Sequence, residues 1–489
     1  MNLNPAHKQE TNWVYLVSFL FIAMNAYLIA KEFFYFSLVP LVLLIVLMAV
    51  YSLDRLVYIA VFVTPLSIQL SDLVRGYDFD MALPSEPIII GILLFFLIKY
   101  LFEGKFDRRI MRHPVSIAIW LNLVWILITC ITSTLPLVSL KFLASRIWYV
   151  VVFYLVASQI FRDRENIRRY IWTYIASFLI VIGYAWSRHA RLGLFNQQAA
   201  HWVVQPFYND HTAYGAILAM LIPVVIGFVY TLHGASLFRR FATWMVLLIF
   251  LTAIVFSYTR AAWVSIAGAL AIYIILRLRI RFVFIALIAV VTIALAYQHR
   301  EEILLQLEQN RQNSSKDLME HVKSISNVAT DVSNLERLNR WSCAWRMFEQ
   351  KPVFGWGPGT YMFNYAPFQL EREKTPISTN AHTRGNAHSE YLGPLSESGV
   401  LGMLSFLAIV VITFLTGIRI WSRESDRKTR VIAISLTLGL FTYYLHGALN
   451  NFLDTDKASV LFWGYTAAIV AIDVYHRNRV DEKEEISQE

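Results

Sequence analysis

Three ionisable residues in the second half of the chain have types and spacing that suit chemistry on a phosphorylated sugar. Arg260 lies in FSYTRAAWVS, Arg337 lies in NLERLNRWSCAW, and His388 begins HSEYLGPLSESG. Arginine binds phosphate oxygens through two N–H groups at once, and histidine transfers protons near neutral pH. Each residue also has a structural interpretation, because arginines anchor helices at membrane surfaces and a single histidine is more often structural than catalytic.

A second group of polar candidates comes from the loop 187–212, where aromatic and hydrogen-bonding side chains alternate. Such a loop suits a sugar-binding surface, and it equally suits an ordinary membrane-interface loop. Two aromatic residues join this group because they share predicted helical faces with Arg337 and His388. The predicted substrate-binding residues are Arg191, Asn209, Asp210, His211, Trp341 and Tyr391.

A metal or nucleotide site is the main alternative for this part of the chain. His382, His388 and Glu390 lie close together in the sequence, but the spacing is not that of an HExxH motif. The segment FGWGPGTY is rich in glycine, but no predicted strand precedes it. We therefore expect no metal and no cofactor, and we interpret the glycines as a turn against the membrane surface.

Two helices are predicted to position the candidates. The first begins with Asn334 as its N-cap and ends at Lys351-Pro352, so Arg337 would lie in its first turn, where free N–H groups attract anions. On the second, His388 and Tyr391 would share one face before the apolar run that starts near Val400.

The rest of the chain is strongly apolar. Of 489 residues, 57% are hydrophobic and 16% are charged, whereas a soluble domain carries about 25% charged residues. Apolar runs recur that are long enough to cross a ~30 Å hydrocarbon layer. We predict an all-α polytopic membrane protein with about 12–14 transmembrane helices. The predicted spans are 13–30, 33–51, 56–70, 88–102, 115–133, 143–161, 170–186, 213–231, 243–257, 262–276, 282–297, 400–418, 431–445 and 460–474.

The third and fourth spans are short, so they could instead form an interfacial or re-entrant pair. We divide the chain into transmembrane helices at 1–297, a large helical loop at 298–399, further transmembrane helices at 400–475 and a tail at 476–489. The helix HREEILLQLEQNRQ is expected to continue out of the membrane into that loop.

The charge distribution predicts the orientation. The formal charge is +9, and the basic residues form short clusters in alternate connections between the spans. By the positive-inside rule these connections and both termini are cytoplasmic, which places the large loop on the opposite side. The same clustering argues against nucleic-acid binding, which would need a basic patch or stripe.

At these motifs the sequence resembles the O-antigen ligase and polymerase superfamily of bacterial surface-glycan enzymes. The family pattern appears as RLNRW, KPVFGWGPGTY and AHSEYLGPLSESG, in that order, and SYTRAAW matches its upstream arginine. The resemblance covers roughly 188–463. It departs at Tyr258-Thr259, where a serine pairing is more usual, and at 311–332, which is longer than expected.

This resemblance implies a GT-C-like fold, with Arg260 and Arg337 binding a lipid-linked diphosphate and His388 activating an acceptor hydroxyl. The expected activity is a metal-independent, inverting transfer of glycan from an undecaprenyl-diphosphate carrier to an acceptor, on the periplasmic side of the bacterial inner membrane. Lipid A–core as acceptor would make the protein a ligase. The alternatives are a polymerase joining lipid-linked repeats, a protein O-glycan ligase and a lipid-linked oligosaccharide transporter. The expected partners are the undecaprenyl-diphosphate-linked donor, lipid A–core or another glycan acceptor, and membrane lipids, but not nucleic acid.

Overall fold

The computed structural model describes residues 5–31, 36–37, 39–40, 52–73, 81–104, 106–280, 298, 332–379 and 385–476. Within these ranges ten helical segments are long and apolar enough to cross a membrane, and the only sheet is one two-stranded antiparallel pair. The predicted all-α, polytopic membrane fold is therefore confirmed. The predicted span 282–297, most of 33–51, the helix expected at 299–312 and the tail beyond 476 lie outside the described residues.

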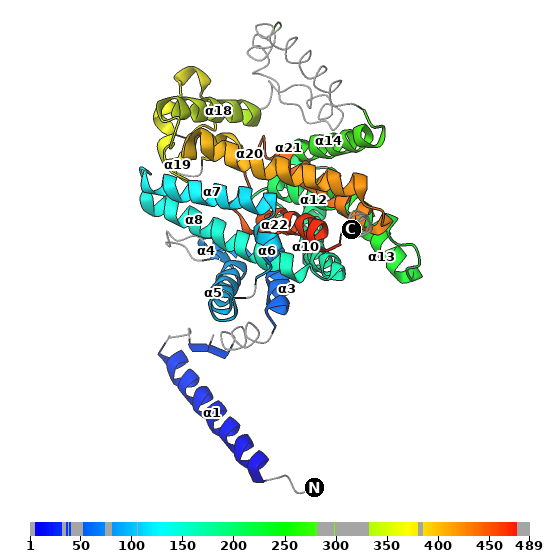
Figure 1. The fold of residues 1–489 in the computed structure, drawn as a ribbon. Coiled ribbons are helices and arrows are strands. Elements are labelled where there is room, and N and C mark those ends of the chain that lie inside the picture. Colours follow the sequence, from blue (N-terminus) through cyan, green and yellow to red (C-terminus); the bar gives the residue numbers. More distant parts are fainter. Residues whose placement is uncertain are drawn as a thin grey trace, which may run out of the picture.

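The N-terminal part contains one detached helix and a short hairpin. Helix α1 (Pro5–Ala30) lies apart from the other helices (Figure 1), and none of its apolar window is buried. Helix α3 (Leu53–Val63) has only 11 residues, which at 1.5 Å per residue do not cross a bilayer. The chain then turns through Thr64–Leu66, β1 (Ile68–Gln69) and α4 (Leu70–Leu73).

The return half of this hairpin begins with β2 (Ala82–Leu83) and continues as the full-length helix α5 (Ser85–Glu103), which packs on α3. The predicted span 56–70 is thus a short helix followed by a turn. The predicted span 88–102 is a candidate membrane-crossing helix. Pro65 explains the difference, because its ring cannot continue the α3 hydrogen-bond ladder.

The central helices start at recognisable caps. Pro114 and Pro136 open α7 (Pro114–Ile131) and α8 (Pro136–Val150), where a missing N–H costs nothing. Helix α8 runs through a π-helical stretch (Val151–Val156) into α9 (Ala157–Ile160). The remaining helices of this part are α6 (Arg108–Met111), α10 (Arg164–Leu192), α11 (Gln197–Ala200), α12 (His211–Tyr230), α13 (Leu237–Phe256) and α14 (Arg260–Arg277).

The C-terminal helices pack on one another and on the central helices. They are α20 (Leu392–Arg423), α21 (Arg427–His446) and α22 (Asp456–Ala471), and a π-helical turn (Ile472–His476) follows. Helix α21 covers the predicted span 431–445. It is not among the ten candidate spans, but it packs against α12, α14 and α20.

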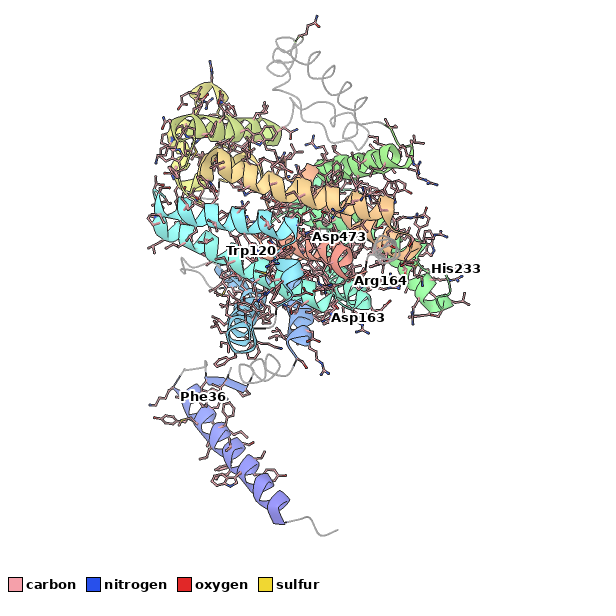
Figure 2. The ribbon with its side chains drawn as sticks, in the orientation of Figure 1. Phe36, Trp120, Asp163, Arg164, His233 and Asp473 are labelled. Atoms are coloured by element: carbon pink, nitrogen blue, oxygen red, sulfur yellow. The ribbon has the colours of Figure 1, made fainter. Side chains whose placement is uncertain are left out.

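Small residues let these helices approach closely. A Cβ built on Gly439 would lie 2.6 Å from the Met220 carbonyl oxygen of α12, and one on Gly417 would meet the Thr437 hydroxyl at 1.9 Å. At the far end of α22, Asp473 accepts hydrogen bonds from His113 Nε2 (3.2 Å) and Arg419 Nη2 (2.6 Å). Figure 2 labels Asp473, which lies in the π-helical turn after α22.

The polar block between α14 and α20 lies over one end of α20 and beside the ends of α7 and α8 (Figure 1). Its described elements are α18 (Val332–Gln350), α19 (Tyr361–Asn364) and two 3₁₀ turns, Ala366–Phe368 and Glu371–Glu373. They enclose a small core of Cys343, Ala344, Met347, Tyr361, Tyr365 and Ala387.

The glycine-rich turn after α18 packs on a kink in α20. Gly399 interrupts α20 with φ +69°, near the boundary predicted from the sequence, and a Cβ there would lie 2.0 Å from the Val353 carbonyl oxygen. A Cβ built on Gly355, whose φ is +68°, would likewise lie 2.3 Å from the Glu397 carbonyl carbon. Backbone hydrogen bonds from Val400 to Pro352 (2.9 Å) and from Trp356 to Ser396 (3.1 Å) close the contact. This contact holds α18 in place above the membrane helices.

Candidate functional site

Arg337 lies inside α18 rather than at its start. The helix already begins at Val332, so the prediction that Asn334 is the N-cap and that Arg337 occupies the first turn is wrong. The Asn334 side chain instead accepts a hydrogen bond from Arg337 Nη1 at 2.9 Å, which fixes one end of the guanidinium. Arg337 Nε is buried and has no hydrogen-bond partner among the described residues. The predicted end of the helix before Lys351 is confirmed.

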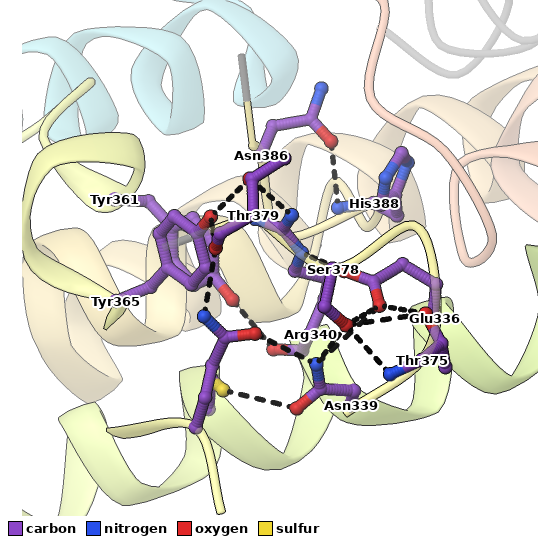
Figure 3. A network of polar contacts seen from close by, with 12 residues as sticks. Glu336, Asn339, Arg340, Tyr361, Tyr365, Thr375, Ser378, Thr379, Asn386 and His388 are labelled. Carbon is purple, nitrogen blue, oxygen red and sulfur yellow. Dashed lines mark hydrogen bonds and ion pairs between the residues drawn. The ribbon is translucent and has the colours of Figure 1, made fainter. Parts of the chain in front are cut away.

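A network of polar groups links α18 to the segments that follow it (Figure 3). The Glu336 carboxylate binds Arg340 Nε at 2.7 Å and accepts hydrogen bonds from the Thr375 and Ser378 hydroxyls. Arg340 also donates to the Thr379 hydroxyl (3.3 Å) and lies 4.0 Å over the Tyr365 ring. Burial opposes ionisation of Glu336, but its hydrogen bonds and the Arg340 charge keep its pKa below the usual value.

His388 follows this network in the chain and has a left-handed backbone conformation, with φ +48°. The predicted helical face shared by His388 and Tyr391 is therefore wrong, because α20 begins only at Leu392. Asn386 Oδ1 accepts from the His388 backbone N–H (3.1 Å), and Trp341 Nε1 donates to the His388 carbonyl (3.4 Å). Burial, followed by the charges of Arg337 and Arg340, lowers the pKa of His388 to about 4. The imidazole is thus neutral at pH 7 and can accept a proton.

Arg260 is the first residue of α14 and lies near Arg337. The Thr259 hydroxyl donates to the His211 carbonyl at 2.8 Å, and a Cβ on Gly215 would lie 2.6 Å from Thr259, so the starts of α14 and α12 are in tight contact. The Arg260 and Arg337 guanidinium groups are close enough to repel one another. The structure therefore brings the two predicted arginines, 77 positions apart in the sequence, to one place.

The start of α12 supplies a carboxylate and an imidazole. Asp210 caps the helix by accepting from the Thr212 and Ala213 N–H groups at 2.8 and 3.0 Å. Burial disfavours its charge, but these hydrogen bonds and the neighbouring His211 keep its pKa below the usual value. His211 stacks on His201, with ring centroids 4.1 Å apart. The charges of Arg337 and Arg260 both act on His211.

One imidazole that was not in the predicted set belongs to the same centre. His446, at the end of α21, is subject to the charges of Arg337 and Asp210 and bonds Asn450 Nδ2 through Nε2 at 3.2 Å. It lies in the connection 446–455, which the sequence marks only by its cluster of polar residues. Its proximity follows from the packing of α21 on α14.

The other predicted residues are placed differently. The exposed side chain of Arg191 is in the last turn of α10, and Asn209 is exposed, with its backbone carbonyl bonded by Gln205 Nε2 at 3.0 Å. No contact recorded for the described residues joins these two side chains to the arginine–histidine centre. Tyr391 donates its hydroxyl to the Tyr444 carbonyl at 2.9 Å, which is a packing role.

The described residues contain no cluster of three histidine, cysteine or carboxylate side chains suited to a metal ion, and His382 lies outside them. A cavity of about 520 Å³ opens elsewhere, between α3, α5 and the start of α10, and no predicted site residue lines it. The described groups at the site are the Arg260 and Arg337 guanidiniums, the imidazoles and the Asp210 carboxylate.

The family comparison agrees with this placement. Residues 245–407 match the family model described as O-Antigen ligase. This part of the chain is similar to the O-antigen ligase superfamily. The match includes Arg260, Arg337 and His388, whereas Asp210, His211 and His446 lie outside it. The similarity supports a ligase- or polymerase-type function, and lipid-linked glycans are the substrates that this family implies. No curated protein matches the chain.

Proposed function

We propose that this chain is a glycosyltransferase that moves a glycan from an undecaprenyl-diphosphate carrier to lipid A–core, on the periplasmic side of the bacterial inner membrane. The observation that carries the proposal is the meeting of Arg260, Arg337 and the neutral His388 at one place beside the helical bundle. The charge pattern supports the periplasmic side, because the basic clusters occupy the alternate, cytoplasmic connections.

The two arginines suit the leaving group. Their mutual repulsion is relieved when a diphosphate binds between them, so the free site is organised for a dianion before it arrives. Arg337 Nε, buried and without a partner among the described groups, is a donor available to a phosphate oxygen. As the bond from the anomeric carbon to the diphosphate breaks, its electron pair moves to the phosphate oxygen, and the fixed guanidinium groups stabilise the developing charge.

His388 suits the acceptor. A neutral imidazole takes the proton from the acceptor hydroxyl as that oxygen attacks the anomeric carbon from the side opposite the diphosphate. One displacement inverts the configuration at that carbon. Nuclear magnetic resonance of the product linkage tests this step, and retention of configuration would contradict it.

The decisive experiment combines purified protein with an undecaprenyl-diphosphate glycan and lipid A–core. We expect transfer by the wild type and a loss of about 10²–10³-fold for Arg337→Ala and for His388→Ala. Arg346→Ala is the matched control, because Arg346 is on the same helix but pairs with Glu373 away from the site. Elongation of lipid-linked repeats instead would indicate a polymerase. Glycan movement across vesicles without transfer would refute the enzyme.

A further inference from the structure

A buried carboxylate two residues after His388 joins the site to another part of the chain. Glu390 is 5% exposed, and its Oε1 atom accepts three hydrogen bonds. The donors are the Tyr443 hydroxyl (2.6 Å), the Phe452 backbone N–H (2.8 Å) and the Leu453 backbone N–H (2.9 Å). All three belong to α21 or to the connection that follows it.

The backbone around Glu390 is attached to the same connection. The Glu390 N–H donates to the Gly447 carbonyl at 2.7 Å. A Cβ added to Gly447 would approach Glu390 Cγ to 3.0 Å, so the two segments are in direct contact. The next residue, Tyr391, bonds the Tyr444 carbonyl. Residues 388–391 and 443–453 are therefore held together as one unit.

Both halves of this unit carry an imidazole on which the charge of Arg337 acts. One half holds His388 in its left-handed conformation, which is unfavourable for a residue with a side chain and persists only where the surroundings fix it. The other half holds His446 and its partner Asn450. Asn386 and Trp341 fix His388 on the side of α18, and Glu390 fixes it on the side of α21.

We propose that Glu390 is a positioning residue, whose side-chain oxygen fixes the His388 backbone and the 443–453 segment in the geometry needed for proton transfer. This inference rests on the proposed transferase function. Glu390 touches neither substrate in this account; it acts through His388 and, on the far side, through the turn that carries His446.

The hydrogen-bond pattern predicts which substitution rescues the role. A single oxygen accepts all three donors, so the carbonyl oxygen of glutamine can replace it without a charge. Burial, with a contribution from the Asp454 charge, raises the pKa of Glu390 to about 7, so an uncharged side chain is already compatible with this environment. Alanine, in contrast, leaves two buried N–H groups and one hydroxyl without their acceptor.

The test compares Glu390→Ala with Glu390→Gln in the full-length protein, using transfer from undecaprenyl-diphosphate glycan. We expect Glu390→Ala to lower kcat about 100-fold, as a displacement of about 1 Å does, with little change in KM for the donor, because the arginines remain in place. Glu390→Gln should keep kcat within roughly threefold of the wild type. Asp426→Ala is the matched control: it removes a carboxylate that caps the opposite end of α21 and should leave kcat unchanged.

The outcomes separate the inference from the function on which it rests. If Glu390→Gln is as inactive as Glu390→Ala, the charge itself is needed and the positioning role is refuted; equal activity of Glu390→Ala and wild type refutes it too. If Glu390→Ala does not fold, Tyr443→Phe decides. That variant removes one donor of the three, and unchanged kcat with an unchanged unfolding temperature would refute the inference. A wild type that transfers nothing refutes the transferase instead.

Discussion

Replacing Arg340 by methionine tests how the polar block is held together. Arg340 and Glu336 form a buried ion pair, with side chains 5% and 7% exposed and 2.7 Å between Arg340 Nε and Glu336 Oε1. Removing one partner of a buried pair costs about 3–5 kcal/mol, because the other charge stays buried. Glu336 keeps the hydroxyls of Thr375 and Ser378, so we expect the lower end, about 3 kcal/mol of unfolding free energy.

Two further variants test whether burial of the ion pair explains the expected loss of stability. Arg346→Met removes an ion pair on the same helix whose side chains are 24% and 25% exposed, so it should cost about 1 kcal/mol or less. The double variant Glu336→Gln with Arg340→Met removes both charges of the buried pair. It should be more stable than Arg340→Met alone by at least about 1 kcal/mol, because no unpaired charge remains.

The assay is unfolding of the detergent-solubilised protein in denaturant, followed by tryptophan fluorescence, because Trp341 and Trp345 report on α18 directly. Equal losses for Arg340→Met and Arg346→Met would refute the claim that burial decides the energy. A double variant no more stable than Arg340→Met would refute the claim that the unpaired Glu336 carboxylate is the cause.

Three other predictions concern the site and its support. The transfer rate should fall at acid pH with a midpoint near 4, the pKa of His388, and a midpoint near 6.5 in a pH–rate profile would contradict this base. Since that pKa is lower in the folded than in the unfolded chain, the contribution of His388 to stability is complete above about pH 6.5 and is lost as the pH falls towards 4. Arg337→Lys keeps the charge but loses the two-pronged phosphate contact, so we expect at least about a tenfold loss in kcat; wild-type kinetics would show that only charge matters. Gly399→Ala should destabilise the protein by about 2 kcal/mol or more in thermal unfolding, because φ is +69° and a Cβ would meet a carbonyl oxygen at 2.0 Å. The control Gly183→Ala, with nothing within 4 Å of its Cβ, should be neutral or stabilising.

The membrane helices could be read from the sequence because hydrocarbon-length apolar runs leave few other folds. Where an apolar run is interrupted, the predicted helix bounds are less accurate. Pro65 ends α3 early, and the weaker hydropathy of α21 did not prevent it from packing in the bundle. The division near residue 400 was predicted, and the structure shows Gly399 as its physical cause.

The site could be predicted by residue type but not by backbone geometry. Periodicity placed His388 on a helix, whereas contacts from Trp341 and Asn386 hold it in a left-handed turn. A left-handed conformation at a histidine depends on tertiary contacts, and those are absent from local sequence patterns. His446 could be recognised only as one polar residue of the last loop, and not as a member of the site, because its place beside Arg337 depends on helix packing.

The burial of α22 bears on how the protein is made. In the segment Asp456–His476, 83% of the residues in a membrane-length window are buried, yet this segment follows the other described membrane helices in the chain. During synthesis the preceding helices enter the bilayer before α22 has been made. They must therefore remain loosely packed until α22 can insert between them. The hydrogen bonds that Glu390 accepts also require residues 443–453. A nascent chain stopped before that point would hold both arginines but no assembled centre, which keeps unfinished copies from acting on lipid-linked sugar.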